Sequence, residues 1–283
     1  MLHVRQVKSN EEFTQLEQIW NNLLSQSPVN NYFMTWDWLW NWWQVFEEKG
    51  DELAILLLER KGEAVGIAPF YIRKKMLGGI YPVRRMMFLG TQEDGEGDVC
   101  SDYMDVIYKD GDEKEVISYI FNTVIGQNVC DEIYLSKMDT SSKTFALFQK
   151  APKNLRLLNN ISNEFISPYI KLLLTWEDYL SSLTSSMRYK IRNERRKLQG
   201  QYTIVFKKAE NQTDLKEGFE ELVKLHQKRW ESRGMAGAFS NNKFTMFHNR
   251  IMPLMMKRGQ LQLTSLLADN KYMGVAYNIM YNN

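Results

Sequence analysis

The sequence predicts a mixed α/β protein (α+β in its strand pairing) with two lobes, each built from largely antiparallel strands flanked by helices. At 283 residues the chain is long enough for two domains of ordinary size. Hydrophobic residues make up 44% and aromatic residues 13%, which supports a packed core. Strand-like runs alternate with helical patterns in both halves, and each half contains one candidate antiparallel hairpin. We therefore expect an N-terminal lobe at residues 1–160 and a C-terminal lobe at residues 161–283.

The first half is predicted to start with a short strand and a helix. We place the helix start at Ser9 or Asn10, because a capping side chain there precedes two glutamates. Strands at 53–59 and 64–72 form a predicted hairpin, in which Pro69 indicates an edge or a bulge. The other elements expected here are strands at 3–7, 85–89, 103–108 and 133–136 and helices at 113–125 and 142–150.

The segment YFMTWDWLWNWWQVF, residues 32–46, holds five of the eight tryptophans. Its tryptophans alternate in part as in a strand, but Trp36, Trp40 and Trp43 also share one helical face. We favour a helix that is capped by Thr35 and continues to Gly50. The aromatic rings fit either core packing or a platform that stacks on sugars, and core packing is the stronger interpretation.

The second half follows a polar stretch around residues 159–163. Its last two strands, 261–268 and 272–281, form a predicted hairpin around Asp269 and Asn270. The remaining elements expected here are strands at 169–174 and 202–207 and helices at 176–199, 213–233 and 242–257. Both halves share an order of strand, helices and hairpin, which is a weak internal repeat.

Composition disfavours several classes of protein. Thirty-six basic against thirty-four acidic residues leave a net charge of +2, too small to indicate a nucleic-acid protein by itself. The three histidines lack metal-ligand spacing, so we expect no metal. Cys100 and Cys130 fit two buried reduced thiols better than a disulfide, which stays open. No signal peptide or transmembrane segment is evident, and we expect a cytoplasmic protein.

Three stretches of the second half carry a family resemblance. The hairpin LQLTSLLADNKYMGVAYNIMY, residues 261–281, looks like the central hairpin that lies beneath the acyl-CoA in the GNAT superfamily. Upstream, WEDYLSSLTSSMRYKIRNERRKLQ (176–199) and LVKLHQKRWESRGMAGAF (222–239) look like the corresponding stretches of CelD-like proteins. In the first half, YFMTWDWLWNWW, GIAPFYI and the FLG and SDYMDVI segments also fit, so the resemblance covers nearly the whole chain.

The chain thus resembles the tandem GNAT-fold acyltransferases of the CelD-like family, which belongs to cellulose and exopolysaccharide biosynthesis. It is distantly similar to Fem-like aminoacyltransferases. The resemblance implies two GNAT-like lobes and transfer of an acyl group from acyl-CoA, the co-substrate, to an amine or hydroxyl. The acceptor would be a small molecule, a sugar or a polysaccharide precursor. Two alternatives stay open: aminoacyl transfer from tRNA, and a non-catalytic binding or assembly protein that keeps the fold.

One apparent family signature is set aside. Gln92 to Gly97 formally match the GNAT pyrophosphate loop, which aims backbone N–H groups at phosphate from a helix N-terminus. Here the loop carries three carboxylates, at Glu93, Asp94 and Glu96, and Asp98 just after it adds a fourth, with a strand expected instead of a helix. These charges would repel a pyrophosphate, so we do not assign this role to the loop.

The basic run RYKIRNERRK, residues 188–197, is a candidate site for the donor. On a helix Arg188, Arg192, Arg195 and Arg196 cluster on one face. Three apolar residues, Met187, Ile191 and Leu198, are expected to turn inward. This face is either solvated or binds the phosphates of CoA, a sugar nucleotide or tRNA. In the second interpretation Arg188, Arg192 and Arg196 are the cofactor-binding residues.

Two further groups are candidate catalytic and substrate-binding residues. His226, Arg229 and Trp230 lie at helical spacing, so His226 is a candidate general base and Arg229 and Trp230 candidate substrate contacts. The alternative is that these side chains only pack and pair. Asp102 and Tyr103 are expected at the start of a strand. Asp102 is a catalytic candidate and Tyr103 a substrate-binding candidate. For Asp102 a structural capping role is an equal alternative. Asp105 should face the other side.

The resemblance also implies that the second lobe is truncated. A complete GNAT lobe continues after this hairpin with a strand, the pyrophosphate loop with its helix, and a closing strand and helix. We therefore expect residues 1–283 to be inactive, with an unpaired edge and an uncovered apolar face on the last strand. The alternative is a compact minimal form in which the N-terminal lobe covers that edge.

Overall fold

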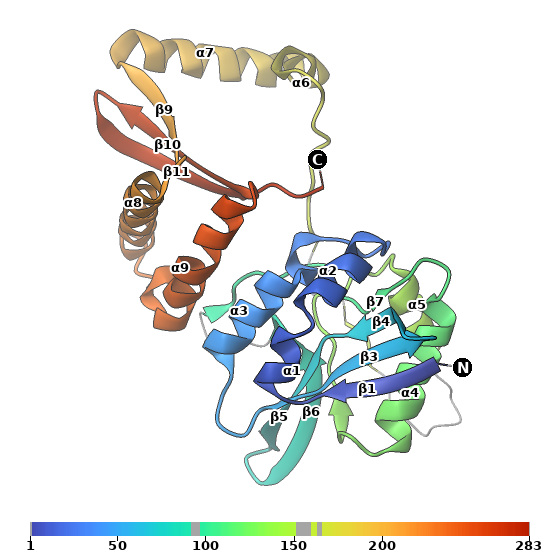
Figure 1. Cartoon of the computed structure of the whole chain (residues 1–283). Helices are drawn as coiled ribbons and strands as arrows, with labels where there is room; N and C mark the ends of the chain where they lie inside the picture. Colours follow the sequence, from blue (N-terminus) through green and yellow to red (C-terminus); the bar gives the residue numbers. More distant parts are fainter. Residues whose placement is uncertain (1, 92–96, 151–159, 163–165, 283) are drawn as a thin grey trace. The chain divides into compact units, whose positions relative to one another are not determined.

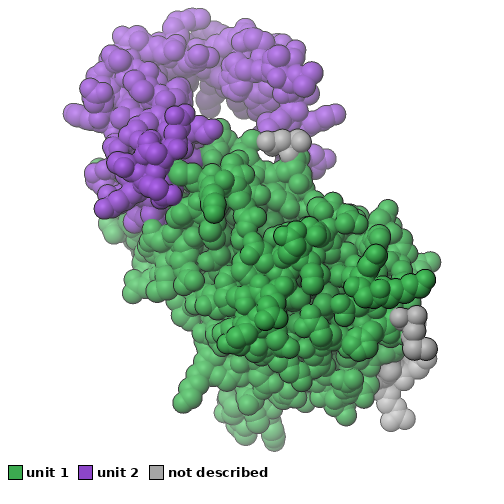
Figure 2. All heavy atoms as spheres, in the orientation of Figure 1, with its two compact units in different colours: residues 1–155, 226–262, 278–283 green, residues 156–225, 263–277 purple. Residues whose placement is uncertain are grey.

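A computed structural model of the chain describes residues 2–91, 97–150, 160–162 and 166–282. The chain forms two compact units (Figure 2). Unit 1 comprises residues 1–155, 226–262 and 278–283, and unit 2 comprises residues 156–225 and 263–277. Each unit combines strands with helices, and the predicted mixed α/β class with largely antiparallel sheets is confirmed.

The first sheet of unit 1 is antiparallel and has the strand order β1-β3-β4-β7. Its strands are β1 (Leu2–Val7), β3 (Ile55–Arg60), β4 (Glu63–Ala68) and β7 (Ile107–Tyr108). The turn between β3 and β4 has φ of 53° at Lys61 and 82° at Gly62. Two successive positive φ values define the tight turn whose twist matches the flanking strands. The predicted hairpin is therefore confirmed.

The second sheet of unit 1 has the order β2-β5-β6-β8. Its strands are β2 (Glu52–Leu53), β5 (Phe70–Leu77), β6 (Tyr81–Phe88) and β8 (Glu132–Ile133), with β6 and β8 parallel. Pro69 separates β4 from β5, because proline has no N–H to donate to a strand ladder. The irregularity predicted at Pro69 is the point where the chain passes from one sheet to the other (Figure 1).

The described helices of unit 1 are α1–α3 on one side of these sheets, α4 and α5 on the other, and α9, which packs against α3 (Figure 1). They are α1 (Asn10–Thr14), α2 (Glu17–Ser25), α3 (Trp36–Phe46), α4 (Glu113–Gly126), α5 (Lys143–Gln149) and α9 (Asn242–Lys257). Ser9 caps α1 and Thr35 caps α3, as predicted from the sequence. The helix α3 ends at Phe46, four residues earlier than expected.

The tryptophans of α3 form the centre of the unit 1 core. Trp38, Trp42 and Trp43 are at most 2% exposed. The indole of Trp38 packs edge-on against Phe247 of α9 with centroids 4.7 Å apart, and its Nε1 donates to Ser101 Oγ at 2.9 Å. Rings buried in this way offer no face to a sugar, so the core-packing interpretation is confirmed.

Unit 2 contains a three-stranded sheet in the order β11-β10-β9. Its elements are α6 (Trp176–Ser182), α7 (Ser185–Gln201), β9 (Ile204–Lys208), α8 (Gln212–Glu231), β10 (Leu261–Ala268) and β11 (Lys271–Ile279), of which α8, β10 and β11 continue into unit 1. The turn between β10 and β11 has φ of 48° at Asp269 and 64° at Asn270. These residue types adopt positive φ more readily than most, which is why the sequence located this turn.

Several expectations are corrected by the structure. Residues 169–174 form no strand, and Tyr169 and Leu174 are 89% and 101% exposed. The strand expected from Tyr103 begins only at Ile107, because positive φ values at Cys100 (60°) and Tyr103 (57°) are incompatible with a regular strand.

The apolar side of α7 and the cysteines also differ from expectation. No residue of α7 is buried, and Met187 and Leu198 are 47% and 43% exposed. Cys100 is exposed and Cys130 half-buried, and no disulfide joins them, so the expectation that both thiols are buried is wrong. Burial raises the pKa of Cys130 to about 11. Residues 92–96 of the apparent pyrophosphate loop lie outside the described residues.

Candidate functional site

The C-terminal end of α8 brings His226 and Trp230 into direct contact. Trp230 Nε1 donates a hydrogen bond to His226 Nε2 at 2.9 Å, four residues back along the helix. His226 Nδ1 lies 3.1 Å from Gln227 Oε1, which can only accept. Both contacts are satisfied when the imidazole is neutral and carries its proton on Nδ1. The predicted helical spacing is confirmed, whereas the role of His226 stays a prediction.

A glycine-containing loop packs against this end of α8. Gln227 Nε2 donates to the carbonyl of Ala236 at 2.6 Å, and Gly237 has φ of 76°. A Cβ at Gly237 would lie 2.6 Å from Gln227 Oε1 and 3.1 Å from Trp230 Cβ. The close approach and the positive φ both require glycine here. Gln227 thus links the imidazole to the loop, a role that the sequence did not suggest.

This geometry limits what His226 can do as a base. Its only lone pair available for a proton, on Nε2, accepts the indole hydrogen of Trp230. Proton uptake at Nε2 requires that this hydrogen bond break first. In this arrangement the hydrogen bond from Trp230 to His226 holds the indole in place. His226 can take part in proton transfer only after the Trp230 side chain has turned away.

We expect a coupling energy of about 0.5–1.5 kcal/mol between His226 and Trp230, the usual net value of a hydrogen bond. Urea unfolding of His226→Gln, Trp230→Phe and the double variant measures it. Trp176→Phe, at a half-exposed tryptophan in α6, is the control for loss of an indole N–H. Strictly additive effects of the two substitutions would show that the contact contributes nothing.

Arg229, Arg192 and Arg196 present exposed positive charge, whereas Arg188 is half-buried. Arg229 makes no ion pair with a described residue. Arg188 Nη1 donates to the carbonyl of Ser181 at 3.2 Å, and Arg192 pairs with Glu177 at 2.9 Å. No hydrogen bond or ion pair joins the Arg196 side chain to the described part of the chain. These α7 arginines belong to unit 2, whereas Arg229 belongs to unit 1.

Asp102 and Tyr103 lie in an irregular segment before β7. Tyr103 is 44% exposed, and its carbonyl accepts from Asn31 Nδ2 at 3.0 Å. Burial raises the pKa of Asp102, while the charge of Lys137 opposes the shift. A carboxylate with a raised pKa is a stronger base than an ordinary aspartate. The sequence predicted a strand start at Asp102 and Tyr103, and this prediction is wrong because β7 begins only at Ile107.

Asp105 is the more strongly perturbed carboxyl group of this segment. It is 4% exposed, and burial raises its pKa to about 6. Its Oδ1 accepts from the backbone N–H of Val106 at 2.7 Å. No local signal in the sequence distinguishes Asp105 from Asp102, because the two carboxyl groups differ in burial.

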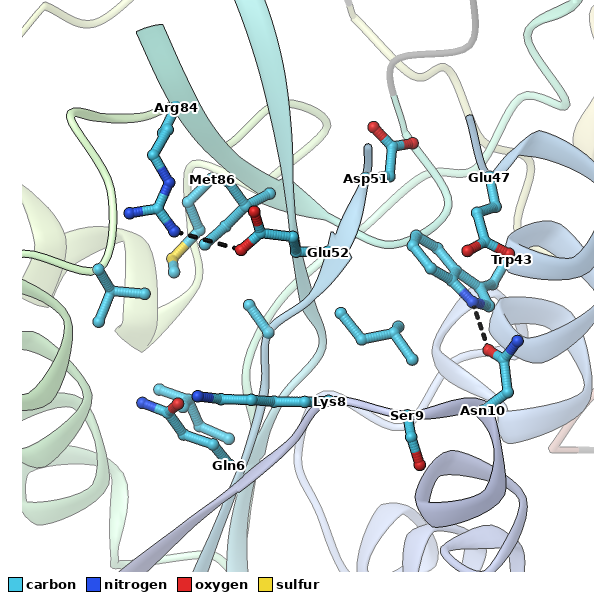
Figure 3. Close-up of a pocket in the computed structure, with 15 residues that line it drawn as sticks. Gln6, Lys8, Ser9, Asn10, Trp43, Glu47, Asp51, Glu52, Arg84 and Met86 are labelled. Carbon is cyan, nitrogen blue, oxygen red and sulfur yellow. Dashed lines mark hydrogen bonds and ion pairs between the residues drawn. The ribbon is translucent and has the colours of Figure 1, made fainter. Parts of the chain in front are cut away.

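Unit 1 also contains a cavity of about 410 Å³ that no sequence motif indicated (Figure 3). Charged and polar side chains surround an apolar floor; the lining residues are Gln6, Lys8, Ser9, Asn10, Trp43, Glu47, Asp51, Glu52, Leu53, Ala54, Leu56, Ile72, Arg84, Met86 and Val129. The cavity has the size of a small-molecule site. It lies where β2 and β3 separate into the two sheets, so its residues come from distant parts of the sequence.

Two contacts fix the walls of this cavity. Trp43 Nε1 donates to Asn10 Oδ1 at 2.8 Å, and Arg84 pairs with Glu52 at 3.3 Å (Figure 3). Burial and the nearby charge of Asp51 raise the pKa of Glu47. None of the residues predicted as catalytic or substrate-binding lines this cavity.

Comparison with known families identifies the C-terminal part of the chain. Residues 185–283 match the model of the acetyltransferase (GNAT) domain. This stretch, about a third of the chain, is similar to the acetyltransferase (GNAT) domain. It spans α7, β9, α8, α9, β10 and β11, and the enzyme class expected from the sequence, a GNAT-type N-acyltransferase, is confirmed at this level. The narrower resemblance to CelD-like proteins stays a prediction.

Solved structures with some similarity include three transferases. An aminoglycoside antibiotic 6'-N-acetyltransferase from Acinetobacter baumannii is 11% identical, covers 60% of this chain and 100% of its own, and has a TM-score of 0.32. FemX is 14% identical over 93% of this chain and 57% of its own, with a TM-score of 0.46. A glucosamine-6-phosphate N-acetyltransferase from Arabidopsis thaliana is 15% identical over 60% and 99%, with a TM-score of 0.31. No curated protein matches the sequence.

Proposed function

We propose that the protein transfers an acyl group from acyl-CoA to an amine or hydroxyl of a small-molecule, sugar or polysaccharide-precursor acceptor. The observation that carries this proposal is the match of residues 185–283 to the GNAT acetyltransferase domain. In such a reaction a bond forms between the acceptor nitrogen or oxygen and the acyl carbon, and the carbon–sulfur bond breaks. The proton of the acceptor leaves, and the thiolate of CoA takes up a proton.

The arginines of α7, of which Arg192 and Arg196 are exposed and Arg188 is half-buried, suit the phosphates of the acyl donor. Arg188, Arg192 and Arg196 lie four residues apart on one face, and guanidinium groups bind phosphate with paired hydrogen bonds. The ion pair of Arg192 with Glu177 is exposed on both sides and contributes about 1 kcal/mol or less. A phosphate can therefore replace Glu177 at little cost. The bound donor would supply an activated thioester.

We propose Asp102 and His226 as the groups that receive the acceptor proton, and Arg229, Tyr103 and Trp230 as acceptor contacts. Asp102 is supported by its raised pKa. His226 is supported by the helical spacing with Arg229 and Trp230, but its Nε2 becomes available only if Trp230 moves. Substitution of each residue separates these roles, because loss of a base lowers kcat and loss of an acceptor contact raises KM.

Calorimetric titration of the full chain with acetyl-CoA tests the donor assignment. We expect Arg192→Glu with Arg196→Glu to weaken binding by about tenfold to a hundredfold, because charged hydrogen bonds to phosphate are lost. The thermal midpoint should change little, since both side chains are exposed. Lys208→Glu with Lys216→Glu is the matched control, with the same change of charge at exposed positions elsewhere in unit 2. Equal affinity of both double variants at low salt would refute the role of α7.

A second candidate donor, aminoacyl-tRNA, is favoured by one observation. The helix α7 carries a run of cationic side chains, and none of its residues is buried. Such a face also suits the backbone of tRNA, as aminoacyl transfer would require. A gel-shift assay with aminoacylated tRNA distinguishes the two donors. Binding of acetyl-CoA without turnover of any amine or sugar acceptor would instead indicate a non-catalytic binding protein.

A further inference from the structure

The end of the β5–β6 hairpin exposes four adjacent apolar side chains. Met76, Leu77, Ile80 and Tyr81 are 57%, 61%, 73% and 69% exposed. The turn between them, Gly78-Gly79, has φ of 60° and 75°, and no atom lies within 4 Å of a Cβ built at either glycine. Scattered apolar residues are normal on a protein surface, whereas a contiguous group marks a contact site.

The hairpin end is surrounded by positive charge. Residues 73–90 contain five arginines and lysines and no aspartate or glutamate. The strand register places Lys74 opposite Arg84 and Arg73 opposite Arg85. Like charges directly opposite one another destabilise a strand pair, and nearby anionic groups reduce this repulsion.

Acidic residues at the base of the hairpin compensate most of this charge. Arg73 pairs with Asp51, Arg84 with Glu52 and Arg85 with Glu132. Lys74, the next residue towards the tip, is exposed and has no ion pair with a described residue. The uncompensated charge therefore lies beside the apolar tip, where an anionic surface would meet both.

We propose that the β5–β6 hairpin end binds the surface of a membrane that contains anionic lipids. Met76 and Leu77 are consecutive strand residues, so their side chains point to opposite faces of the hairpin. A flat protein surface covers one face only, whereas lipid surrounds an inserted tip on all sides. Tyr81 suits the interface, where its ring is buried and its hydroxyl hydrated, and Lys74 lies at the level of the headgroups.

This contact is peripheral in geometry. The hairpin end projects from the other elements of unit 1 (Figure 1). Among the described residues, no helix has the length and apolar character that a bilayer span requires. Apolar insertion and electrostatic attraction then act together, as stable peripheral binding requires two signals.

Sedimentation of the full chain with vesicles tests the proposal. We expect binding to phosphatidylcholine vesicles that contain about one third phosphatidylglycerol, and little binding to phosphatidylcholine alone. Leu77→Ser with Ile80→Ser should lower the partition coefficient on anionic vesicles at least about tenfold. Lys74→Glu should lower it by about fivefold at low salt, with a smaller effect at high salt.

Met273→Ser is the matched control, because Met273 is 60% exposed on β11 and should leave vesicle binding unchanged. Unchanged thermal midpoints verify that the exposed substitutions keep the fold. The proposal is overturned if the wild type does not sediment with anionic vesicles at low salt, or if both serine substitutions leave binding intact. It is also overturned if the wild type dimerises through these residues instead, which size-exclusion chromatography of the same variants detects.

Discussion

Arg73→Gln should lower the free energy of unfolding by about 3–5 kcal/mol, because it leaves a buried carboxylate without its partner. The side chains of Arg73 and Asp51 are 4% and 2% exposed. Arg73 Nη2 lies 2.6 Å from Asp51 Oδ2, and Arg73 Nε lies 3.0 Å from Asp51 Oδ1. Arg73 Nη2 also donates to the carbonyl of Phe46, at the end of α3. The substitution therefore disturbs the junction between α3 and β5 as well. Urea unfolding provides the measurement.

Two variants make this expectation specific to burial. Arg60→Gln removes an arginine that pairs with Asp112 and Glu115, but the Arg60 side chain is 34% exposed. We expect it to cost about 1 kcal/mol or less. Arg73→Met combined with Asp51→Leu should recover much of the loss, since no unpaired charge is left inside. Equal costs of Arg73→Gln and Arg60→Gln would contradict the argument.

The elements that the sequence predicted correctly depend on local signals. Ser9 and Thr35 cap helices through hydrogen bonds to residues three positions ahead, so a short window of sequence contains the whole interaction. The hairpin turns at Lys61-Gly62 and Asp269-Asn270 are local in the same sense. The sequence correctly indicated an irregularity of the strand at Pro69. The result of this irregularity, the passage of the chain to a second sheet, depends on strand partners far away in the sequence.

The errors share a different cause, the need for a distant partner. Residues 169–174 have the composition of a strand, but a strand forms only when another strand pairs with it, and no described strand does. The apolar side chains of α7 follow helical spacing, yet periodicity shows which residues share a face and not what covers that face. The segment 103–106 is irregular because Cys100 and Tyr103 have positive φ values. Cysteine and tyrosine rarely adopt such values, so the sequence does not indicate them.

The candidate site divides in the same way. The spacing of His226, Arg229 and Trp230 was visible in the sequence, because residues four apart on a helix are neighbours. The occupation of His226 Nε2 by Trp230 and the link through Gln227 were not, since they depend on side-chain rotamers. The cavity shown in Figure 3 combines residues from 6 to 129, and no local pattern indicates it.

Acid should destabilise the protein through His248, by about 3 kcal/mol between pH 6.5 and pH 4. This side chain of α9 is 6% exposed among Phe239, Phe244 and Phe247, and burial lowers its pKa to about 4. In this range the unfolded chain binds a proton that the folded chain does not, so stability falls as pH falls.

His248→Phe isolates this contribution, because the variant has no imidazole to protonate at this position. Asp105 changes the stability with pH in the opposite direction. Its pKa is raised to about 6, so the folded chain binds more protons than the unfolded chain between about pH 4 and pH 6. The two terms oppose each other in the wild type. In His248→Phe the effect of Asp105 is uncompensated, so acidification from pH 6 to pH 4 should increase the stability of this variant relative to the wild type.

Urea unfolding across this range measures the difference, with His3→Phe, at an exposed histidine, as the control. Parallel pH profiles for the wild type and His248→Phe would show that His248 is not buried as a neutral group.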